Sequence, residues 1–213
     1  MCGIVGGITN RDIAPILIEG LRRLEYRGYD SAGLAIISPE NSMQRLRAVG
    51  KVSELTRIER RHNLHGSTGI AHTRWATHGA PSETNAHPHT SSNEIAVVHN
   101  GIIENHQALR ERLIENGYGF YSQTDSEVCA HLIHFFFQTN QCLLTSVQLA
   151  VAEMKGAFAL GVIYHNDPSR LIAVRKGSPL VIGLSQQGNF IASDPLALQN
   201  VIDKVIYLEE DDI

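Results

Sequence analysis

Apolar runs of strand length alternate along the chain with stretches of helical periodicity. The apolar run at residues 3–8 is typical of a buried strand, and apolar residues then recur at helical spacing over residues 13–24. Asp12 is expected to cap that first helix. Further strands are predicted at residues 34–38, 44–49, 69–73, 95–99, 158–164, 171–175, 180–184, 190–192 and 205–208. Further helices are predicted at residues 52–61, 106–116, 124–137 and 143–154.

Local signals support two of the helix ends. Gly117 is expected to stop the helix at 106–116. Thr124-Asp-Ser-Glu127 has the spacing of a capping box and should open the next helix. Many strands at hairpin spacing, together with separate helices, predict a one-domain α+β fold of layered, mainly antiparallel sheets.

A long stretch without periodicity, residues 74–93, interrupts this order. It is rich in Thr, His, Pro, Ser and Asn. A segment of about 20 residues without regular structure is long for a compact domain, and such segments are usually binding loops or lids. We therefore expect part of a functional site here.

Composition narrows the class of protein. The chain has 213 residues, 43% of them hydrophobic, and a formal net charge of −4. It carries no basic tract, which disfavours a nucleic-acid partner, and no apolar run near the roughly 20 residues that span a bilayer. Its N-terminus lacks the features of a signal peptide. Three cysteines make no disulfide framework, so a reducing cytoplasm is the expected location.

Cys2 is the first candidate for chemistry. A residue this small at position 2 allows an aminopeptidase to remove Met1, which would leave a thiol and a free α-amine on one residue. An α-amine titrates near about 7.7–8.0, so part of its population is unprotonated at neutral pH and can take the thiol proton. One residue would then supply both nucleophile and base. By itself, a cysteine at position 2 is weak evidence for catalysis.

Five segments in a fixed order strengthen that interpretation. They are Met1-Cys-Gly-Ile-Val-Gly6, Leu24-Glu-Tyr-Arg-Gly-Tyr-Asp-Ser-Ala-Gly33, His72-Thr-Arg-Trp-Ala-Thr-His-Gly79, Asn85-Ala-His-Pro-His89 and His99-Asn-Gly-Ile-Ile-Glu-Asn105. In this order the chain resembles the class II glutamine amidotransferases over essentially its whole length. The segment that begins at Arg27 favours the sugar-phosphate-aminating branch over the purine-, asparagine- and glutamate-forming relatives.

The resemblance implies a fold and a reaction. The fold would be the four-layer αββα sandwich of the N-terminal-nucleophile hydrolases, with residues 1–213 forming one glutaminase domain. Cys2 would attack the side-chain amide of L-glutamine and release ammonia, and water would then release L-glutamate. The sugar-phosphate isomerase domains of the family would be missing from this chain, and they are its expected partners. The sequence leaves an oligomer open.

Asn100 and Gly101 are the implied oxyanion-stabilising pair. The side-chain amide of Asn100 and the backbone N–H of Gly101 would bind the tetrahedral intermediate, where one missing donor typically costs about 10²- to 10³-fold in rate. Without the family motifs, Asn-Gly after the strand at 95–99 is more simply explained as a type I′ hairpin turn.

Arg74 and Asp125 are the implied clamp for the two charged ends of glutamine. A guanidinium binds a carboxylate through two parallel hydrogen bonds, so Arg74 would hold the α-carboxylate. Asp125 would accept from the α-ammonium, although an acidic residue in a first helical turn can simply complement the helix dipole. Thr77, His78 and His87 would add hydrogen bonds to the substrate.

Trp75 and Arg27 have implied supporting roles. Trp75, the only tryptophan, would cover the bound glutamine and gate the passage of ammonia, or it would be a packing aromatic. Arg27 would orient Cys2 or favour its thiolate, and a structural ion pair explains it equally well.

The clustered histidines raise the question of a metal. His72, His78, His87, His89 and His99 lie close in sequence, but no cysteine or carboxylate accompanies them at ligand spacing. We expect no metal and no cofactor. Two other functions stay open: a glutaminase domain that feeds a different acceptor, and a non-catalytic module that senses glutamine.

Overall fold

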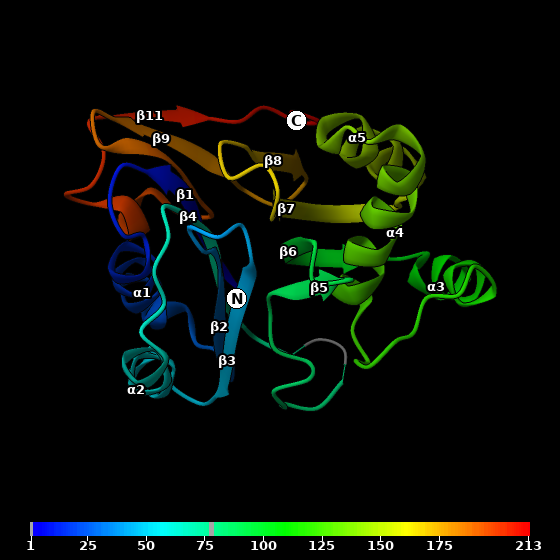
Figure 1. Ribbon diagram of the computed structural model, residues 1–213, viewed down its shortest axis with the longest axis horizontal. Coiled ribbons are helices and arrows are strands. Elements are labelled where there is room, and N and C mark those ends of the chain that lie inside the picture. The colour runs from blue at the N-terminus through cyan, green and yellow to red at the C-terminus, as the bar shows by residue number, and fades with distance from the viewer. Residues whose placement is uncertain (1, 77–78) are drawn as a thin grey trace.

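Two antiparallel β-sheets form the framework of the structure, a computed structural model that describes residues 2–76 and 79–213 (Figure 1). The seven-stranded sheet contains, in spatial order, β11 (Lys204–Tyr207), β9 (Val181–Ser185), β10 (Gly188–Ala192), β1 (Gly3–Thr9), β4 (Thr68–Arg74), β2 (Ser31–Ile37) and β3 (Met43–Val49). The four-stranded sheet contains β5 (His89–Ser91), β6 (Ile95–Ile103), β7 (Gly156–Tyr164) and β8 (Leu171–Lys176).

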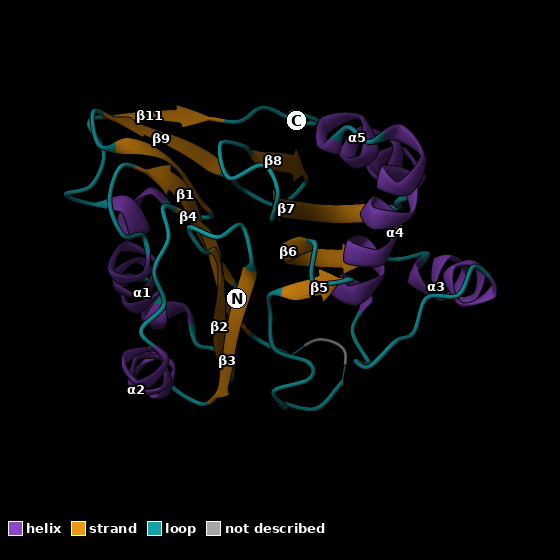
Figure 2. Ribbon diagram, in the orientation of Figure 1, coloured by secondary structure: helices purple, strands orange, loops and turns teal. Residues whose placement is uncertain are grey.

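Helices cover the outer face of each sheet (Figure 2). The seven-stranded sheet is covered by α1 (Ala14–Arg23), α2 (Val52–His62) and the 3₁₀ turn η2 (Pro195–Leu198), and the turn η1 (Glu25–Arg27) follows α1. The four-stranded sheet is covered by α3 (His106–Glu115), α4 (Asp125–Asn140) and α5 (Leu143–Glu153). Within the described residues, no helix is long and apolar enough to cross a membrane.

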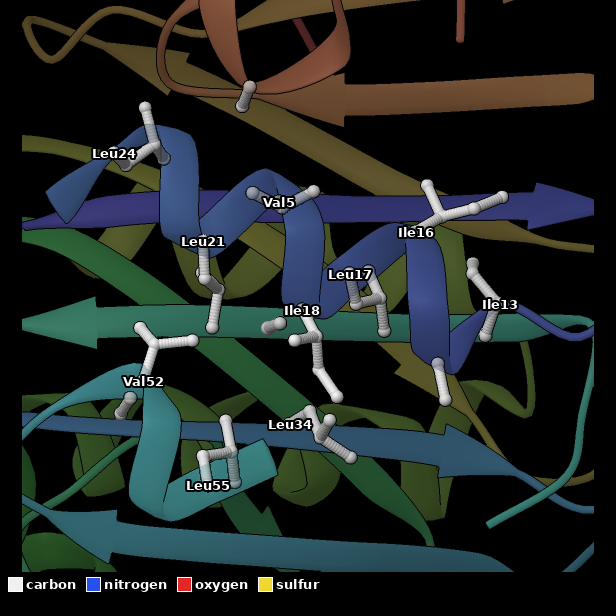
Figure 3. Packing of buried hydrophobic residues seen from close by; sticks show 14 of the residues in the cluster. Val5, Ile13, Ile16, Leu17, Ile18, Leu21, Leu24, Leu34, Val52 and Leu55 are labelled. Atoms are coloured by element: carbon white, nitrogen blue, oxygen red, sulfur yellow. The ribbon is translucent and has the colours of Figure 1, made fainter. Parts of the chain in front are cut away.

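Three separate hydrophobic clusters show that the layers are stacked α, β, β, α. One cluster joins α1 and α2 to the seven-stranded sheet, where Leu17, Leu21 and Leu34 are buried together (Figure 3). A second joins the four-stranded sheet to α3, α4 and α5. The third, which includes Ile4 and Val98, lies between the two sheets.

The sequence pattern explains this stacking. On β1, Ile4 belongs to the cluster between the sheets and Val5 to the cluster under α1. On β6, Val97 belongs to the cluster under α3, α4 and α5, and Val98 belongs to the cluster between the sheets. Successive residues of a strand point to opposite faces, so a strand covered on both faces needs a continuous apolar run. The predicted α+β fold with two antiparallel sheets is confirmed.

Two local predictions were wrong. Asp12 does not cap the first helix: Ile13 is the N-cap residue, and the Asp12 carboxylate instead accepts hydrogen bonds from the backbone N–H of Gly66 and the ring of His65. The stretch at 74–93, expected to be irregular, contains the short strand β5. Thr124 caps α4 as predicted, accepting from the backbone N–H of Glu127 at 3.4 Å.

Strand β6 is longer than expected, and this bears on the site. It continues to Ile103, and Asn100 and Gly101 pair with Ala159 and Phe158 on β7. The alternative of a type I′ hairpin turn at Asn-Gly is therefore wrong. Both residues lie inside the four-stranded sheet, with Asn100 on the face that packs against the other sheet.

Candidate active site

Cys2 lies directly before β1, the central strand of the seven-stranded sheet. Antiparallel pairing sets Gly3 opposite Thr73 on β4, which brings the residues after β4 next to Cys2. The Cys2 Sγ accepts a hydrogen bond from the backbone N–H of Trp75 at 3.3 Å and lies 3.6 Å from the Trp75 carbonyl oxygen. The end of β4 thus fixes the position of the thiol.

The environment of Cys2 favours the neutral thiol. Burial raises the pKa of the Cys2 thiol, and this effect outweighs the hydrogen bond from Trp75 and the charge of Arg74, which act in the opposite direction. A thiol with a raised pKa is a poor nucleophile at neutral pH unless a base takes its proton. The site therefore requires a base close to Sγ.

Two side chains converge on the carbonyl oxygen of Cys2. Arg27 Nη1 donates to it at 3.4 Å and Asn100 Nδ2 donates to it at 3.3 Å. Arg27 is also held by an ion pair with Asp194, whose Oδ2 lies 2.7 Å from Nη2, and by a contact with Ser193. Arg27 thus forms an ion pair and also contacts the backbone of Cys2, and its effect on the thiol stays a prediction.

Asn100 is buried and is held from its other end by a histidine. The Asn100 Oδ1 lies 2.9 Å from Nε2 of His72, a residue of β4 in the opposite sheet. Gly101, next to Asn100, has a φ of +125°, a conformation that favours glycine.

A small inner cavity lies on one side of Cys2. It is lined by Cys2, Arg74, Trp75, His87, His99, Gly101, Thr124, Asp125 and Ser126. Its volume of about 20 Å³ is close to the minimum that holds one water molecule. Glutamine is far larger, so binding it here requires the walls of this cavity to move apart.

The two predicted clamp residues, Arg74 and Asp125, both line the inner cavity and are both 3% exposed. Arg74 lies 3.9 Å from Asp30 Oδ1 and donates to the Gly79 carbonyl at 3.4 Å. Asp125 lies in the first turn of α4, and its Oδ2 accepts the backbone N–H of Ile103 at 2.9 Å. Two side chains of opposite charge type, each in contact with other protein groups, thus line the same cavity.

A larger outer cavity lies on the other side of Cys2. Its volume is about 420 Å³, and its lining is Cys2, Arg27, Trp75, Asn100, Gly101, Ile102, Ser178 and Pro179. Trp75 belongs to both cavities and is 54% exposed, with its indole packed against Gly28. A half-exposed tryptophan that lines two cavities is not part of the hydrophobic core, and its role as a gate stays a prediction.

Buried histidines form a stack behind the site. The rings of His72 and His87 are parallel with centroids 4.0 Å apart, and His89 meets His87 edge-on. Burial lowers the pKa of His72 and of His89 to about 3 and that of His87 well below its usual value, so all three are neutral at neutral pH. The described residues contain no group of three or more His, Cys, Asp or Glu that could hold a metal ion.

The structure brings most of the predicted residues together around Cys2: Arg27, Arg74, Trp75, His87, Asn100, Gly101 and Asp125. Thr77 and His78 lie outside the described residues. Sequence reasoning missed the role of His72 in contacting Asn100, and it missed Ser126, which bonds His99 Nδ1 at 2.8 Å beside Asp125. His72 could have been found only from the strand register, which pairs it with Ile4 next to the nucleophile.

Gly101 supplies a stability test of this geometry. A methyl group at Gly101 would clash with the backbone oxygen of Ala157, whereas one at Gly117, also at positive φ, would meet nothing within 4 Å. We expect Gly117→Ala to cost about 1 kcal/mol and Gly101→Ala about 3 kcal/mol or more, because it adds a clash to the same strain. Urea denaturation of both variants measures the difference. Equal losses would mean that no close backbone approach exists at Gly101.

Comparisons with known proteins show which family this chain is similar to. Residues 72–200 match a protein family described as a glutamine amidotransferase domain. The chain is 60% identical over its whole length to glutamine–fructose-6-phosphate aminotransferase (isomerizing) from Legionella pneumophila (strain Paris), and equally identical to the protein of that name from Yersinia pseudotuberculosis serotype I (strain IP32953). It spans 35% of the length of these curated relatives.

Solved structures share the fold. Glutamine phosphoribosylpyrophosphate amidotransferase from B. subtilis, complexed with ADP and GMP, superposes with a TM-score of 0.81 and 26% identity over 98% of this chain and 45% of that chain. A glutamine aminotransferase class-II domain protein from Silicibacter pomeroyi superposes with a TM-score of 0.66 at 15% identity, over 98% of this chain and 92% of that one. The expected N-terminal-nucleophile hydrolase fold is confirmed.

Proposed function

Because this chain belongs to the glutamine amidotransferase domain family, we propose that it hydrolyses L-glutamine to L-glutamate and ammonia with Cys2 as the nucleophile. The observation that carries this proposal is the position of Cys2, which lines the same cavity as two buried side chains of opposite charge type, Arg74 and Asp125. Glutamine has an α-carboxylate and an α-ammonium to match them.

The reaction requires two steps. In the first, the α-amine of Cys2, freed by loss of Met1, takes the thiol proton as Sγ attacks the side-chain amide carbon of glutamine. The Nδ2 group of Asn100 and the backbone N–H of Gly101 stabilise the oxyanion. The amine then gives the proton to the leaving nitrogen, so that ammonia departs and a glutamyl thioester remains. In the second step water attacks the thioester, and glutamate and the free thiol are released.

The larger role of the chain follows from its relatives. They are named glutamine–fructose-6-phosphate aminotransferase, and this chain spans 35% of their length. We propose that it is their glutaminase domain, that its ammonia leaves past Trp75, and that a C-terminal isomerase domain uses this ammonia to convert fructose 6-phosphate to glucosamine 6-phosphate. A reducing cytoplasm suits this role because Cys2 has to remain a free thiol.

Glutamate release by two forms of the chain tests the proposed reaction. The first form has lost Met1, as checked by intact mass. The second carries a lysine inserted between Met1 and Cys2, which blocks the removal of Met1 and converts the Cys2 amine to an amide. We expect the first form to turn over glutamine and the second to be about 10²-fold slower or worse, because general-base assistance typically contributes at least that much.

Matched melting temperatures would show that the insertion leaves the fold intact. No turnover by the processed form would contradict the proposed reaction. Equal turnover by both forms would contradict the α-amine as the base.

A further inference from the structure

The proposed nucleophile and the proposed oxyanion donors lie on different sheets. Cys2 leads into β1 of the seven-stranded sheet, whereas Asn100 lies on β6 of the four-stranded sheet. Catalysis tolerates little error in such a distance, so a contact that crosses the layer between the sheets has to fix it. His72 on β4 makes such a contact, since it pairs with Ile4 on β1 and its Nε2 reaches Asn100 Oδ1 at 2.9 Å.

We propose that His72 is a positioning residue that sets which end of the Asn100 amide faces the reacting carbon. The proposal rests on the function proposed above. His72 touches neither Cys2 Sγ nor the substrate in this scheme, and it acts only through Asn100.

The hydrogen-bond network determines the direction of the amide. The end of the Asn100 side chain near Cys2 contacts a carbonyl oxygen, which can only accept, so this end has to be the Nδ2 donor. The other end is then the Oδ1 acceptor, and the His72 Nε2 facing it has to carry a proton. One Nδ2 hydrogen is used on Cys2 O, and the second is free for the oxyanion.

A reversed amide would work against the reaction. Its oxygen would face the carbonyl of Cys2 and the developing oxyanion, both of which repel it. Because Asn100 has a donor at one end and an acceptor at the other, a histidine that donates from Nε2 excludes this arrangement. A buried side chain without a donor at this position would leave the Cys2 carbonyl as the remaining contact that opposes the reversed amide, and it would leave Asn100 Oδ1 without its His72 partner.

His72 is well suited to hold this arrangement. Its side chain is fully buried and its ring is stacked on His87 at 4.0 Å, so the imidazole plane is fixed. Burial keeps the pKa of His72 at about 3, so the ring stays neutral with a single N–H. Its Nδ1 is buried and makes no hydrogen bond of good geometry within the described residues, which lowers stability. A stability cost of this kind is expected where a polar residue serves the site.

Two variants of His72 with similar side-chain volume separate its role as a hydrogen-bond donor from its role in packing. Gln and Met have similar length and volume, but only Gln can donate a hydrogen bond to Asn100 Oδ1. We expect His72→Gln to keep kcat for glutamine hydrolysis within about tenfold of the parent chain. We expect His72→Met to lose about 10²-fold in kcat, the typical effect of losing one oxyanion donor, with KM changed less than about threefold.

Two further measurements exclude a general structural effect. Alkylation of Cys2 by iodoacetamide is a direct displacement at carbon and forms no oxyanion, so its rate should be the same in both variants. In an Asn100→Ala background, His72→Met should lower kcat by less than about threefold, because its effect passes through Asn100. Melting temperatures of both variants check that they are folded.

The outcomes separate this proposal from the one it rests on. If the parent chain releases no glutamate, the proposed function fails. If the parent is active and His72→Gln and His72→Met lose activity equally, or His72→Met slows alkylation as much as hydrolysis, His72 does not direct the amide and the inference is overturned. An additive effect in the Asn100→Ala background would overturn it as well.

Discussion

Cys2→Ala is expected to reduce glutamate release by roughly 10⁴-fold or more, because the covalent step has no other nucleophile. The replacement removes the sulfur atom of a residue that lines the inner cavity together with Arg74 and Gly101. Water attack on an amide without a thioester intermediate is slow, so the remaining donors supply only a small residual rate. Glutamate release by the Cys2→Ala chain, compared with the parent chain prepared in the same way, measures the loss.

The same variant should fold and bind glutamine. The hydrogen bonds of Cys2 Sγ in the described residues are with the Trp75 backbone, and Cys2 is only partly buried, so little packing is lost. Glutamine should therefore still raise its melting temperature, since a ligand that binds only the folded state stabilises it. Hydrolysis that persisted in pure Cys2→Ala protein would refute the assignment of the nucleophile.

This experiment also distinguishes an enzyme from a sensing module. A module that only senses glutamine would show the same glutamine-dependent melting shift in both chains and no turnover in either. An enzyme shows turnover in the parent chain alone. Arg74 and Asp125 would be needed in both cases, so their presence at the cavity does not separate the two functions.

The layered fold could be predicted from the sequence because burial leaves a clear pattern. Strand β6 begins Ile95-Ala-Val-Val98, an unbroken apolar run that only a strand covered on both faces requires. The end of the same strand could not be predicted, because Asn100-Gly101 is also the preferred pair for a tight hairpin turn. Pairing with β7, a contact distant in sequence, decides between the two.

The site was predictable only in part for a similar reason. The motifs contain Cys2 and Arg74, and the family resemblance implied a substrate role for Asp125 at the start of a helix. His72 supports the site through a contact between two sheets, and no local signal encodes that contact. Asp12 failed as a helix cap because a distant turn at Gly66 competes for its carboxylate.

The second large effect is expected at Arg74. Arg74→Met should lower kcat/KM for glutamine by about 10³-fold, mostly through KM, because truncating one partner of a buried, hydrogen-bonded charge pair typically costs about 2–5 kcal/mol. Arg74→Lys should recover part of this loss, since lysine keeps the charge but not the planar fork that fits a carboxylate. Steady-state glutamate release over a range of glutamine concentrations measures both.

Changes in the substrate make this test specific. The parent chain should discriminate strongly against 4-aminobutanamide, which is glutamine without its α-carboxylate, because that substrate lacks the carboxylate that Arg74 is proposed to bind. Arg74→Met should hydrolyse 4-aminobutanamide and glutamine with similar kcat/KM. Asp125→Asn should in turn lose discrimination against glutaramate, which lacks the α-ammonium.

The crossed pairs are the controls. Arg74→Met should still discriminate against glutaramate, and Asp125→Asn should still discriminate against 4-aminobutanamide, because each variant removes only one half of the clamp. Arg74 is buried and lies 3.9 Å from Asp30, so its loss also has a folding cost that melting temperatures will register. A folding cost alone would lower kcat/KM for glutamine, 4-aminobutanamide and glutaramate by the same factor. If Arg74→Met lowered kcat/KM equally for all three, Arg74 would support the fold without binding the α-carboxylate of glutamine. The residues that bind the carboxylate would then have to be sought elsewhere.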